Sequence, residues 1–361
     1  MKLTINTPDF QELIAKANKG VGNNRLIPVT SLIKLEVKNN DLTVVTTDGI
    51  NYLYLVKPSV GQEDFYAVIE ADKFVKLVSL FNSDVIELEV KDNALRVKCG
   101  KGKYDFPLIM NDDGSEIISY PDPEKNFKSV EEDKNLRLDD VRRILDGMKY
   151  ALAKSFETPC YANYFIGDGC LSTDSYKVAY FNKQLLNKNN LINPATLELI
   201  PLLDDDYVTV SYSNKEILFK NSCGSIVAKK VDGLNEYQSD VIKELANADY
   251  PSSCTIGKAD FVAAMSRISL FVDDMDENAV EFVFGNDGLV MKTKNSASDE
   301  KIPYTSSNNV VDFDCQLDYV QLTSCVKSSK ASDLTIMFGN EGSVKLVDGD
   351  MIHIMSCVED L

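Results

Sequence analysis

The chain repeats one structural pattern six times, and this repetition is the feature that most limits its possible folds. Apolar residues at helical spacing recur at intervals of roughly sixty residues. Several of these segments open with an acidic residue, as in Asp9-Phe10, Asp260-Phe261 and Asp318-Tyr319. An acidic first turn suits the positive end of a helix dipole. We therefore expect helices at residues 9–19, 71–81, 138–154, 193–203, 259–271 and 316–330.

Alternating apolar runs that fold back at polar turns follow each expected helix. In the first copy, residues 32–37 and 42–45 alternate on either side of Asn39-Asn40-Asp41. Alternation predicts half-buried strands, and such turn residues predict hairpins. Five more turns of this kind lie at residues 92–93, 167–169, 213–214, 285–288 and 339–342. Each copy is therefore expected to be a helix followed by an antiparallel meander.

The copies pair into three similar domains. A comparable helix start recurs every second copy, at Asp9, Asp139 and Asp260, and polar stretches containing proline lie at residues 119–125 and 247–252. The predicted fold class is α+β, with two helices packed on antiparallel β-sheets in each domain. The predicted domains are residues 1–125, 126–248 and 249–361.

Composition restricts the compartment. Hydrophobic residues make up 44% of the 361, no apolar run approaches membrane-spanning length, and the first residues lack the layout of a signal peptide. We expect a soluble, cytoplasmic protein with no membrane partner. Its eight cysteines are scattered without a C-x-x-C pair, so reduced thiols are expected.

The charge is strongly acidic but unevenly distributed. The net charge is -18, whereas the helical segments, counted over residues 8–19, 70–81, 138–154, 193–203, 258–271 and 316–330, contain twelve bases and ten acids. A mildly basic helical layer in an acidic protein suits one surface reserved for phosphate. The alternative is that lysine and arginine simply favour solvated helix faces, and these counts leave both explanations open.

The sequence offers little for catalysis. His353 is the only histidine, and no P-loop, G-x-S-x-G or zinc spacing is present. Residues 274–278 begin like a calcium loop, but Ala279 and Gly285 occupy the positions of the required glycine and glutamate, so an acidic solvated loop is favoured. A hydrolase using two carboxylates stays open, because 56 acids allow many pairs. We expect no catalytic residue, metal or cofactor.

Short motifs along the whole chain resemble the bacterial DNA polymerase III beta subunit family, the beta sliding clamps. They are RLIPV at 25–29, TDG at 47–49, GKYDF at 102–106, LSTDSYKVA at 171–179, VDG at 231–233 with Tyr237, and FVAAMSRI at 261–268. Their order and spacing carry the resemblance. It implies a processivity factor without catalytic activity, which encircles double-stranded DNA and tethers polymerases to it.

The resemblance also implies a head-to-tail homodimeric ring. Its interface would use Tyr104 and Phe106 on an edge strand with Leu270 and Phe271 on the facing helix, although these apolar residues also suit a domain core. Bases lining the hole would contact phosphates without reading sequence. The residues expected to face DNA are Arg25, Lys73, Arg142, Arg143, Lys149, Tyr161 and Lys327.

A partner pocket is the last implication. In this family a short hydrophobic peptide of polymerases, the clamp loader and repair proteins binds there. The matching residues are Ala162, Thr173, Ser175, Tyr176, Lys177, Val178, Ser343, Ile354, Met355, Ser356, Cys357 and Val358. The chain departs from the family at Ser175-Tyr176-Lys177, where Gly-His-Arg is usual, and at its SCVEDL ending, where Met-Pro-Met-Arg-Leu is usual. An altered peptide preference is expected, and the acidic ending favours a basic flank in the partner.

A β-rich repeat scaffold that binds proteins but not DNA is the alternative function. It accounts for the meanders and for the acidity. It does not account for basic residues gathered in the helices, so a sliding clamp is the preferred prediction.

Overall fold

The computed structural model describes residues 2–58, 63–154, 158–272, 278–294, 298–340 and 342–358. Its contacts divide the chain into two compact units. Unit 1 comprises Met1–Val141 and Ala195–Lys230, and unit 2 comprises Arg142–Pro194 and Val231–Leu361. The predicted division into three domains stays a prediction.

Unit 1 contains two antiparallel sheets. One has the order β1-β6-β7-β8, formed by β1 (Lys2–Asn6), β6 (Val85–Lys91), β7 (Ala94–Cys99) and β8 (Gly102–Pro107). The other has the order β10-β15-β16-β17-β4-β3-β2-β5, with β9 (Glu131–Glu132) also paired to β15. Its strands are β10 (Leu136–Arg137), β15 (Tyr207–Tyr212), β16 (Glu216–Asn221), β17 (Gly224–Lys229), β4 (Asn51–Pro58), β3 (Asp41–Thr47), β2 (Leu32–Lys38) and β5 (Phe65–Glu70).

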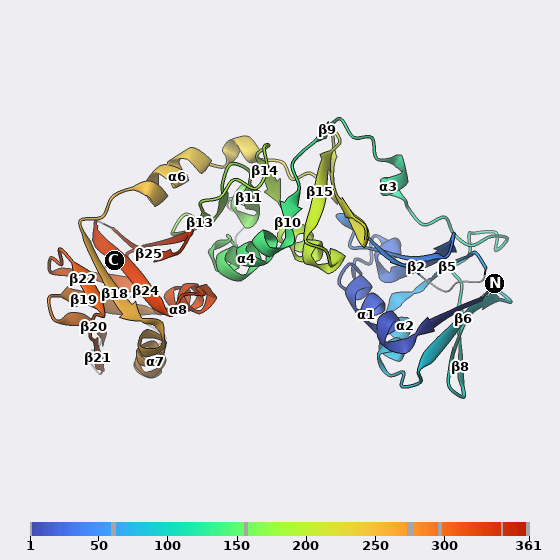
Figure 1. Ribbon diagram of the computed structural model, residues 1–361, viewed down its shortest axis with the longest axis horizontal. Coiled ribbons are helices and arrows are strands. Elements are labelled where there is room, and N and C mark those ends of the chain that lie inside the picture. Colours follow the sequence, from blue (N-terminus) through green and yellow to red (C-terminus); the bar gives the residue numbers. More distant parts are fainter. Residues whose placement is uncertain are drawn as a thin grey trace. The chain divides into compact units, whose positions relative to one another are not determined.

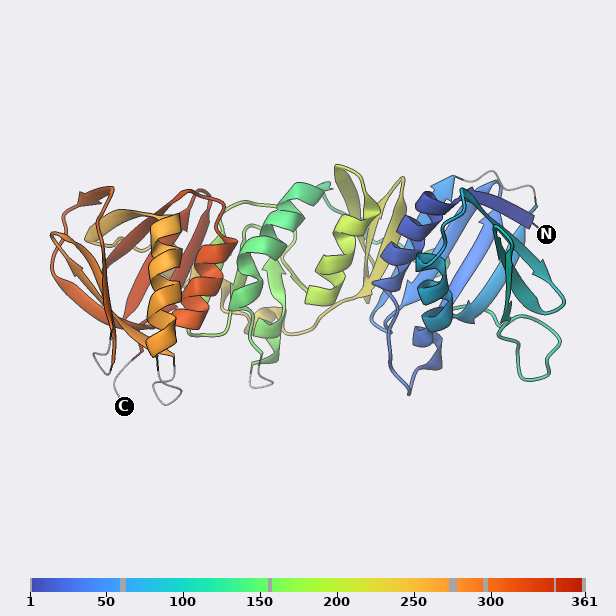
Figure 2. The same cartoon turned by 90° about the horizontal axis from the view of Figure 1, so that it is seen from below.

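Helices α1 (Thr7–Asn18) and α2 (Ala71–Ser79) lie side by side against the strands of unit 1 (Figure 2). Each buries an apolar stripe, and Phe10 and Phe74 meet edge to face with ring centroids 6.1 Å apart. The remaining short helices around this unit are η1 (Pro28–Ser31), α3 (Pro123–Asn126), α5 (Pro194–Leu199) and η4 (Ile200–Leu203). The sheets and helices therefore share one packed core.

Unit 2 has the same combination of sheets. The longer one runs β14-β11-β12-β13-β26-β25-β24-β18-β22 and the shorter one β21-β20-β19-β23. The strands of the longer sheet are β14 (Asn190–Ile192), β11 (Tyr164–Ile166), β12 (Cys170–Thr173), β13 (Lys177–Phe181), β26 (Met351–Ser356), β25 (Ser343–Asp348), β24 (Asp333–Asn340), β18 (Ser252–Gly257) and β22 (Ser306–Asn308). Those of the shorter sheet are β21 (Asp299–Ile302), β20 (Gly288–Thr293), β19 (Ala279–Gly285) and β23 (Phe313–Asp318).

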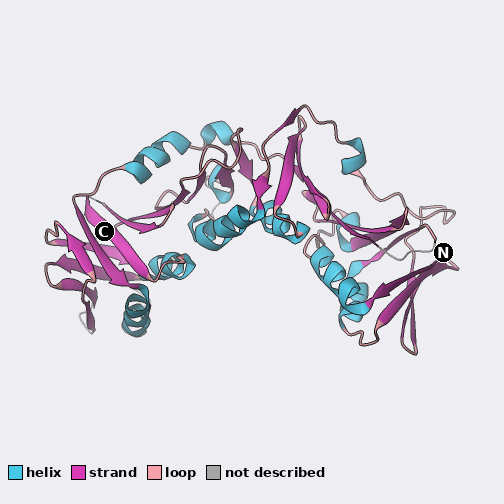
Figure 3. Cartoon of the chain, viewed as in Figure 1, coloured by secondary structure: helices cyan, strands magenta, loops and turns pink. Residues whose placement is uncertain are grey.

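Helices α7 (Lys258–Ile268) and α8 (Tyr319–Ser328) lie side by side in unit 2, as α1 and α2 do in unit 1 (Figure 2). The other helices drawn in Figures 1 and 3 are α4 (Leu138–Met148), which continues into η2 (Lys149–Ala151), η3 (Pro159–Ala162), η5 (Leu234–Glu236), α6 (Ser239–Asn247) and η6 (Ser269–Phe271). Within the described ranges, no helix is long and apolar enough to cross a membrane.

Hairpins are confirmed at all six predicted places, and Glu341 of the last predicted turn lies outside the described residues. Each lies between consecutive antiparallel strands, from β2–β3 to β24–β25. Asn39 and Asn40 have φ of 52° and 71°, and Asp92 and Asn93 have φ of 53° and 56°. Two consecutive left-handed residues match the right-handed twist of the flanking strands, which is why Asn and Asp occupy these turns.

The predicted helices are also confirmed, with boundaries that differ by one to three residues at several ends. Residues 316–318 end β23 instead of opening a helix, and α8 begins at Tyr319. Asp318 caps that helix by accepting the amide N–H groups of Val320 at 2.8 Å and Gln321 at 3.0 Å. Helix α6 (Ser239–Asn247) was not predicted, because it lies outside the sixty-residue repeat.

In each longer sheet, one pairing joins two strands that are far apart in the sequence. In unit 1, β17 pairs with β4 from Gly224↔Leu55 to Ala228↔Asn51. A Cβ on Gly224 would lie 2.0 Å from the Tyr54 carbonyl oxygen, so only glycine permits this approach. In unit 2, β13 pairs with β26 from Lys177↔Met355 to Phe181↔Met351.

The single histidine lies within the second of these pairings. His353 on β26 is buried, and its Nδ1 is 2.9 Å from the Tyr150 hydroxyl. Burial is the main cause that lowers the His353 pKa to about 4, and the nearby Arg143 charge adds to it. The folded protein therefore holds a neutral imidazole that the unfolded chain protonates more readily.

Acid should destabilise the protein through this residue. Because the folded pKa lies below the unfolded value of about 6.5, the folded state keeps its full stability from the neutral imidazole above pH 6.5. This stability is lost as pH falls toward about 4. The free energy of unfolding should fall by about 3 kcal/mol more across that window in the wild type than in His353→Gln. Urea unfolding measured from pH 7 to pH 4 tests this, and parallel pH profiles for both proteins would contradict it.

Candidate nucleic-acid and partner-peptide sites

A tight turn joins β12 to β13 at the predicted pocket. The Thr173 hydroxyl donates to the Lys177 carbonyl at 2.8 Å and accepts the Ser175 amide at 3.0 Å. Asp174 Oδ1 accepts the amides of Tyr176 and Lys177 at 3.1 and 3.0 Å, and its Oδ2 pairs with the Lys177 ammonium. Asp174, absent from the predicted set, therefore organises the turn.

Unit 1 builds the same turn between β3 and β4. The Thr47 hydroxyl donates to the Asn51 carbonyl at 2.6 Å and accepts the Gly49 amide at 3.0 Å. Asp48 Oδ1 accepts the amides of Ile50 and Asn51 at 2.8 and 2.7 Å. The third residue is left-handed in both turns, with φ of 94° at Gly49 and 82° at Ser175. The shared Thr-Asp pair in the sequence is the signal that reveals this equivalence.

The structure brings the two predicted halves of the pocket together. Val178 pairs with Ile354, and the Ser356 amide donates to the Tyr176 carbonyl at 2.9 Å. On the other side of β26, Ser343 pairs with Ser356. Strands from residues 173–178 and 354–356 are thus direct neighbours, with the start of β25 beside them.

The predicted pocket residues differ in their access to solvent. Tyr176 is the most prominent, with 74% of its surface exposed, and Ser175 and Ser356 are also exposed. Ala162, Ser343, Cys357 and Val358 are partly exposed. The buried residues are Thr173, Lys177, Val178, Ile354 and Met355.

Ala162 and Ser343 each lie beside residues that the sequence did not place in the pocket. Ala162 ends η3, whose Cys160 and Tyr161 pack in the same core cluster as Val178 and Ile354. Ser343 Oγ lies 2.8 Å from the hydroxyl of Tyr250, which the sequence prediction did not include. The only hint of Tyr250 in the sequence is an aromatic residue within a polar, proline-containing stretch.

Five residues predicted to face DNA are exposed: Arg25, Lys73, Arg142, Lys149 and Lys327. Lys73 lies on α2, Lys327 in the last turn of α8, and Arg142 on α4. No carboxylate in the described parts of the chain pairs with Lys73 or Lys327. These side chains can therefore reach an external phosphate from helices in both units.

Arg143 and Tyr161 are placed differently from the other predicted DNA-facing residues. Arg143 Nη2 donates to Asp348 Oδ2 at 2.6 Å, and the two side chains are only 14% and 9% exposed. Burial alone would raise the Asp348 pKa, but hydrogen bonds and charge from Arg143, with the Lys330 amide, lower it. Tyr161 is 8% exposed and meets Tyr237 edge to face at 5.0 Å. Both side chains stabilise unit 2 from within, so neither is available on its surface.

Other helical bases are also neutralised by acids. Lys76 pairs with Asp72 at 2.6 Å, and Lys330 pairs with Asp146 at 3.5 Å. Arg267 makes a two-pronged contact with Glu300, at 2.5 and 2.9 Å. Pairing of this kind reduces the positive potential of the helical layer below what residue counts indicate.

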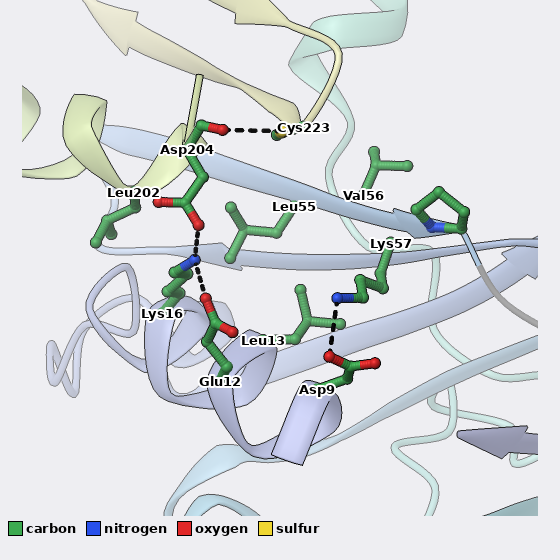
Figure 4. Close-up of a pocket in the computed structure, with 11 residues that line it drawn as sticks. Asp9, Glu12, Leu13, Lys16, Leu55, Val56, Lys57, Leu202, Asp204 and Cys223 are labelled. Atoms are coloured by element: carbon green, nitrogen blue, oxygen red, sulfur yellow. Dashed lines mark hydrogen bonds and ion pairs between the residues drawn. The ribbon is translucent and has the colours of Figure 1, made fainter. Parts of the chain in front are cut away.

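A cavity of about 270 Å³ lies in unit 1 between α1, β4 and η4. Figure 4 shows the residues that line it. Lys16 pairs there with Glu12 at 2.5 Å and with Asp204, and Lys57 pairs with Asp9 at 3.2 Å. Partial burial works to lower the Lys16 pKa, but its bonds to Asp204 and Glu12 raise the pKa above the usual value. The charged side chains are directed at one another, which suits structural ion pairs.

The predicted interface residues lie at sheet edges or are well exposed. Tyr104 and Phe106 are on β8, the outermost strand of its sheet. Phe106 packs edge to face on Phe74 at 5.3 Å, so it also supports the core of unit 1. In unit 2, Leu270 and Phe271 are 80% and 49% exposed on η6. An ordinary core role is therefore excluded for Leu270.

Within the described residues, no group of three His, Cys, Asp or Glu side chains is arranged to hold a metal ion. The calcium-like segment at 274–278 falls mostly outside those residues.

Comparison with known proteins assigns the fold. Residues 1–116 match the family described as DNA polymerase III beta subunit, N-terminal domain. A beta sliding clamp of Helicobacter pylori is 22% identical over 286 residues, which cover 74% of this chain and 73% of that protein. The beta subunit of Streptococcus pyogenes DNA polymerase superposes with a TM-score of 0.84 at 16% identity, with 100% of both chains covered. The H. pylori beta clamp bound to a DNA ligase peptide superposes at 0.80 with 14% identity, over 99% of this chain and 100% of that one.

The protein thus has the fold of the bacterial sliding clamps, with helices packed on antiparallel sheets along its whole length. The resemblance to the DNA polymerase III beta subunit family, predicted from its motifs, is confirmed.

Glycine should be the better residue at the third position of the β12–β13 turn. A serine at φ of 82° is strained, whereas Gly49 meets the same requirement without a Cβ. Ser175→Gly should therefore stabilise the protein by about 1 kcal/mol, and Gly49→Ser should destabilise it by a similar amount. Chemical denaturation of the two variants measures both effects, and a destabilised Ser175→Gly would show that the serine makes a compensating contact.

Proposed function

We propose that this chain is a DNA sliding clamp, a non-catalytic processivity factor whose two copies close head to tail around duplex DNA. The observation that carries the proposal is the clamp fold, which extends over the whole chain. The homodimeric ring, the phosphate-facing helices and the partner pocket are its three parts. A cytoplasmic location, with DNA polymerase, clamp loader and repair proteins as partners, belongs to the same proposal.

Ring closure is supported by the edges of the two short sheets. β8 ends the sheet of unit 1, and β21 ends the sheet of unit 2. The other outer strand of unit 2, β23, already receives a bond from the Val358 amide to the Gln316 carbonyl at 2.8 Å. An open edge is a ready template for a strand of another chain, and β8 of one copy can pair with β21 of the next.

Charge and apolar surface favour the same pairing. Lys101 and Lys103 are exposed on and beside β8, whereas β21 carries exposed Asp299 near exposed Lys301, and its Glu300 is already paired with Arg267. Asp299 facing the lysines of β8 would favour β8 meeting β21 over β8 meeting itself. Leu270 and Phe271 add exposed apolar area on the helix that follows α7.

DNA would be held through its backbone. Arg25, Lys73, Arg142, Lys149 and Lys327 offer exposed positive charge on helices and one loop, which suits contacts with phosphate. Contacts of this kind are independent of sequence and weaken as salt rises. Such contacts allow movement along the duplex.

A protein-binding scaffold that does not encircle DNA is the competing function. It is favoured by the net charge of -18 and by the ion pairs that neutralise Lys16, Lys76, Arg267 and Lys330. Topological retention on DNA separates the two functions, because a scaffold has no ring to thread.

A closed ring should stay on circular DNA and leave linear DNA. We expect wild type to have twice the 40.2 kDa chain mass, and to remain on nicked circular DNA after ATP-driven loading by a bacterial clamp loader until a restriction enzyme cuts the circle. Leu270→Asp with Phe271→Asp should give a 40.2 kDa monomer that is not retained. Val241→Asp, an exposed apolar residue on α6, is the matched control.

Light scattering measures the mass of each protein. Gel filtration of the protein–DNA mixture shows whether the protein stays on the circle. A wild type that is strictly monomeric, or retention that is indifferent to cutting the circle, would reject the ring.

Peptide binding should depend on the exposed part of the predicted pocket. Val178 and Met355 are core residues, so Asp at either would damage the fold itself. Tyr176 offers a large exposed ring, and Tyr176→Ala should weaken binding of a fluorescent hydrophobic clamp-binding peptide about tenfold, or ~1.4 kcal/mol. Tyr207→Ala, at an exposed tyrosine of unit 1, should leave the affinity unchanged. Fluorescence anisotropy compares the three proteins, and equal affinities would move the site elsewhere.

A further inference from the structure

Two cysteines from distant positions meet in unit 2. Cys315 lies on β23 and is buried, whereas Cys357 follows β26 and is partly exposed. Cys357 packs against the core cluster that contains Cys315, and both residues line one cavity. Cys357 is also one of the predicted pocket residues, whereas Cys315 is not.

Backbone hydrogen bonds hold the pair in place. The Cys357 amide donates to the Gly342 carbonyl at 2.8 Å, and the next amide, of Val358, donates to the Gln316 carbonyl at 2.8 Å. Gln316 directly follows Cys315, so the segment after β26 runs along the outer edge of β23. The contact between the thiols is therefore part of the fold.

The pair opens onto a cavity of about 410 Å³. Cys315 and Cys357 line it with Gly342 and Val358, and Glu281 and Asp314 supply two carboxylates. A small solute can reach the thiols through this opening, but an anionic one would meet negative charge at short range.

The two thiols differ in their surroundings, because Cys315 is buried and Cys357 is partly exposed. The neighbouring Cys357 side chain, together with burial, raises the pKa of Cys315 far above the ordinary range, so Cys315 keeps its proton. The Cys315 side chain lowers the pKa of Cys357 despite partial burial. The more accessible sulfur is therefore the better nucleophile, and the buried sulfur is positioned to act second.

We propose that Cys315 and Cys357 form a redox-active dithiol, which a small neutral hydroperoxide converts into an intrachain disulfide. The Cys357 thiolate attacks one oxygen of hydrogen peroxide, breaks the O–O bond and gives a sulfenic acid and hydroxide. The Cys315 sulfur then attacks the Cys357 sulfur and breaks its S–O bond. The proton of the Cys315 thiol passes to the departing hydroxyl group, which leaves as water. Two thiols and one peroxide give one disulfide and two waters, so the thiols are oxidised and the peroxide is reduced.

The consequence for binding rests on the proposed function. Cys357 and Val358 belong to the predicted partner pocket, and a covalent bond to β23 would draw Cys357 toward the core and restrict both residues. Because peptide binding commonly requires side-chain adjustment in the receptor, oxidation should weaken it. We expect at least a threefold loss of affinity for the fluorescent hydrophobic peptide.

Disulfide mapping tests the site directly. The reduced full-length protein is treated with hydrogen peroxide, unfolded with a thiol-blocking reagent and digested without reductant for mass spectrometry. A peptide linking Cys315 to Cys357 is expected in wild type and in Cys223→Ser, but not in Cys357→Ala or Cys315→Ala. Cys99 is an internal control, because its lowered pKa comes with a serine partner, Ser83 Oγ at 2.9 Å. It should oxidise without forming this cross-link.

Oxidation of Cys357 to sulfenic or sulfinic acid without a link to Cys315 would overturn the dithiol site. Peptide affinity, measured on the cross-linked and the reduced protein, then tests the consequence. Equal affinity in the two forms would overturn the regulatory role and leave the disulfide standing. A reduced protein that binds no peptide would instead reject the proposed pocket, and with it the regulatory role.

Discussion

Backbone pairing between strands that are far apart in sequence is the interaction on which both units depend. The β4–β17 pairing joins residues 51–55 to 224–228, and the β13–β26 pairing joins residues 177–181 to 351–355. Each continues one longer sheet across a seam that would otherwise leave two rows of unpaired N–H and C=O groups. Close approach at the first seam requires Gly224, and the second seam buries His353. Without these pairings, neither the long sheets nor the neighbourhood of Tyr176 and Ser356 would exist.

Local features of the fold were accessible from the sequence because local chemistry determines them. Asn39-Asn40 and Asp92-Asn93 adopt left-handed conformations that few other residues tolerate, so their hairpins could be located to the residue. Asp318 was recognised as an acidic helix start, but the alternation of Cys315 and Leu317 continues β23 up to the cap. Helix α6 was missed because the prediction followed the repeat, and this helix has no counterpart in it.

Features set by tertiary contacts could not be predicted in the same way. Arg143 pairs with Asp348, 205 residues away, and Lys16 pairs with Asp204, 188 residues away. A count of charges over the helices treats these bases like exposed Lys73, although their charge is already compensated. Tyr161 was likewise expected to face DNA but packs on Tyr237 in the core. The candidate DNA surface is therefore smaller than the sequence suggested, because Arg143 and Tyr161 are held inside unit 2.

The turns at 47–51 and 173–177 show which departures from the family pattern affect the site. A Thr and an Asp make the hydrogen bonds that fix each of these two turns. Of the three departing residues, Ser175 bears the backbone strain, and Lys177 is buried against Asp174. Only Tyr176 projects a large side chain into solvent. The substitutions in this turn therefore preserve its framework and leave one aromatic ring as the changed side chain that meets solvent, so a partner peptide that binds here should present an apolar or aromatic group to Tyr176.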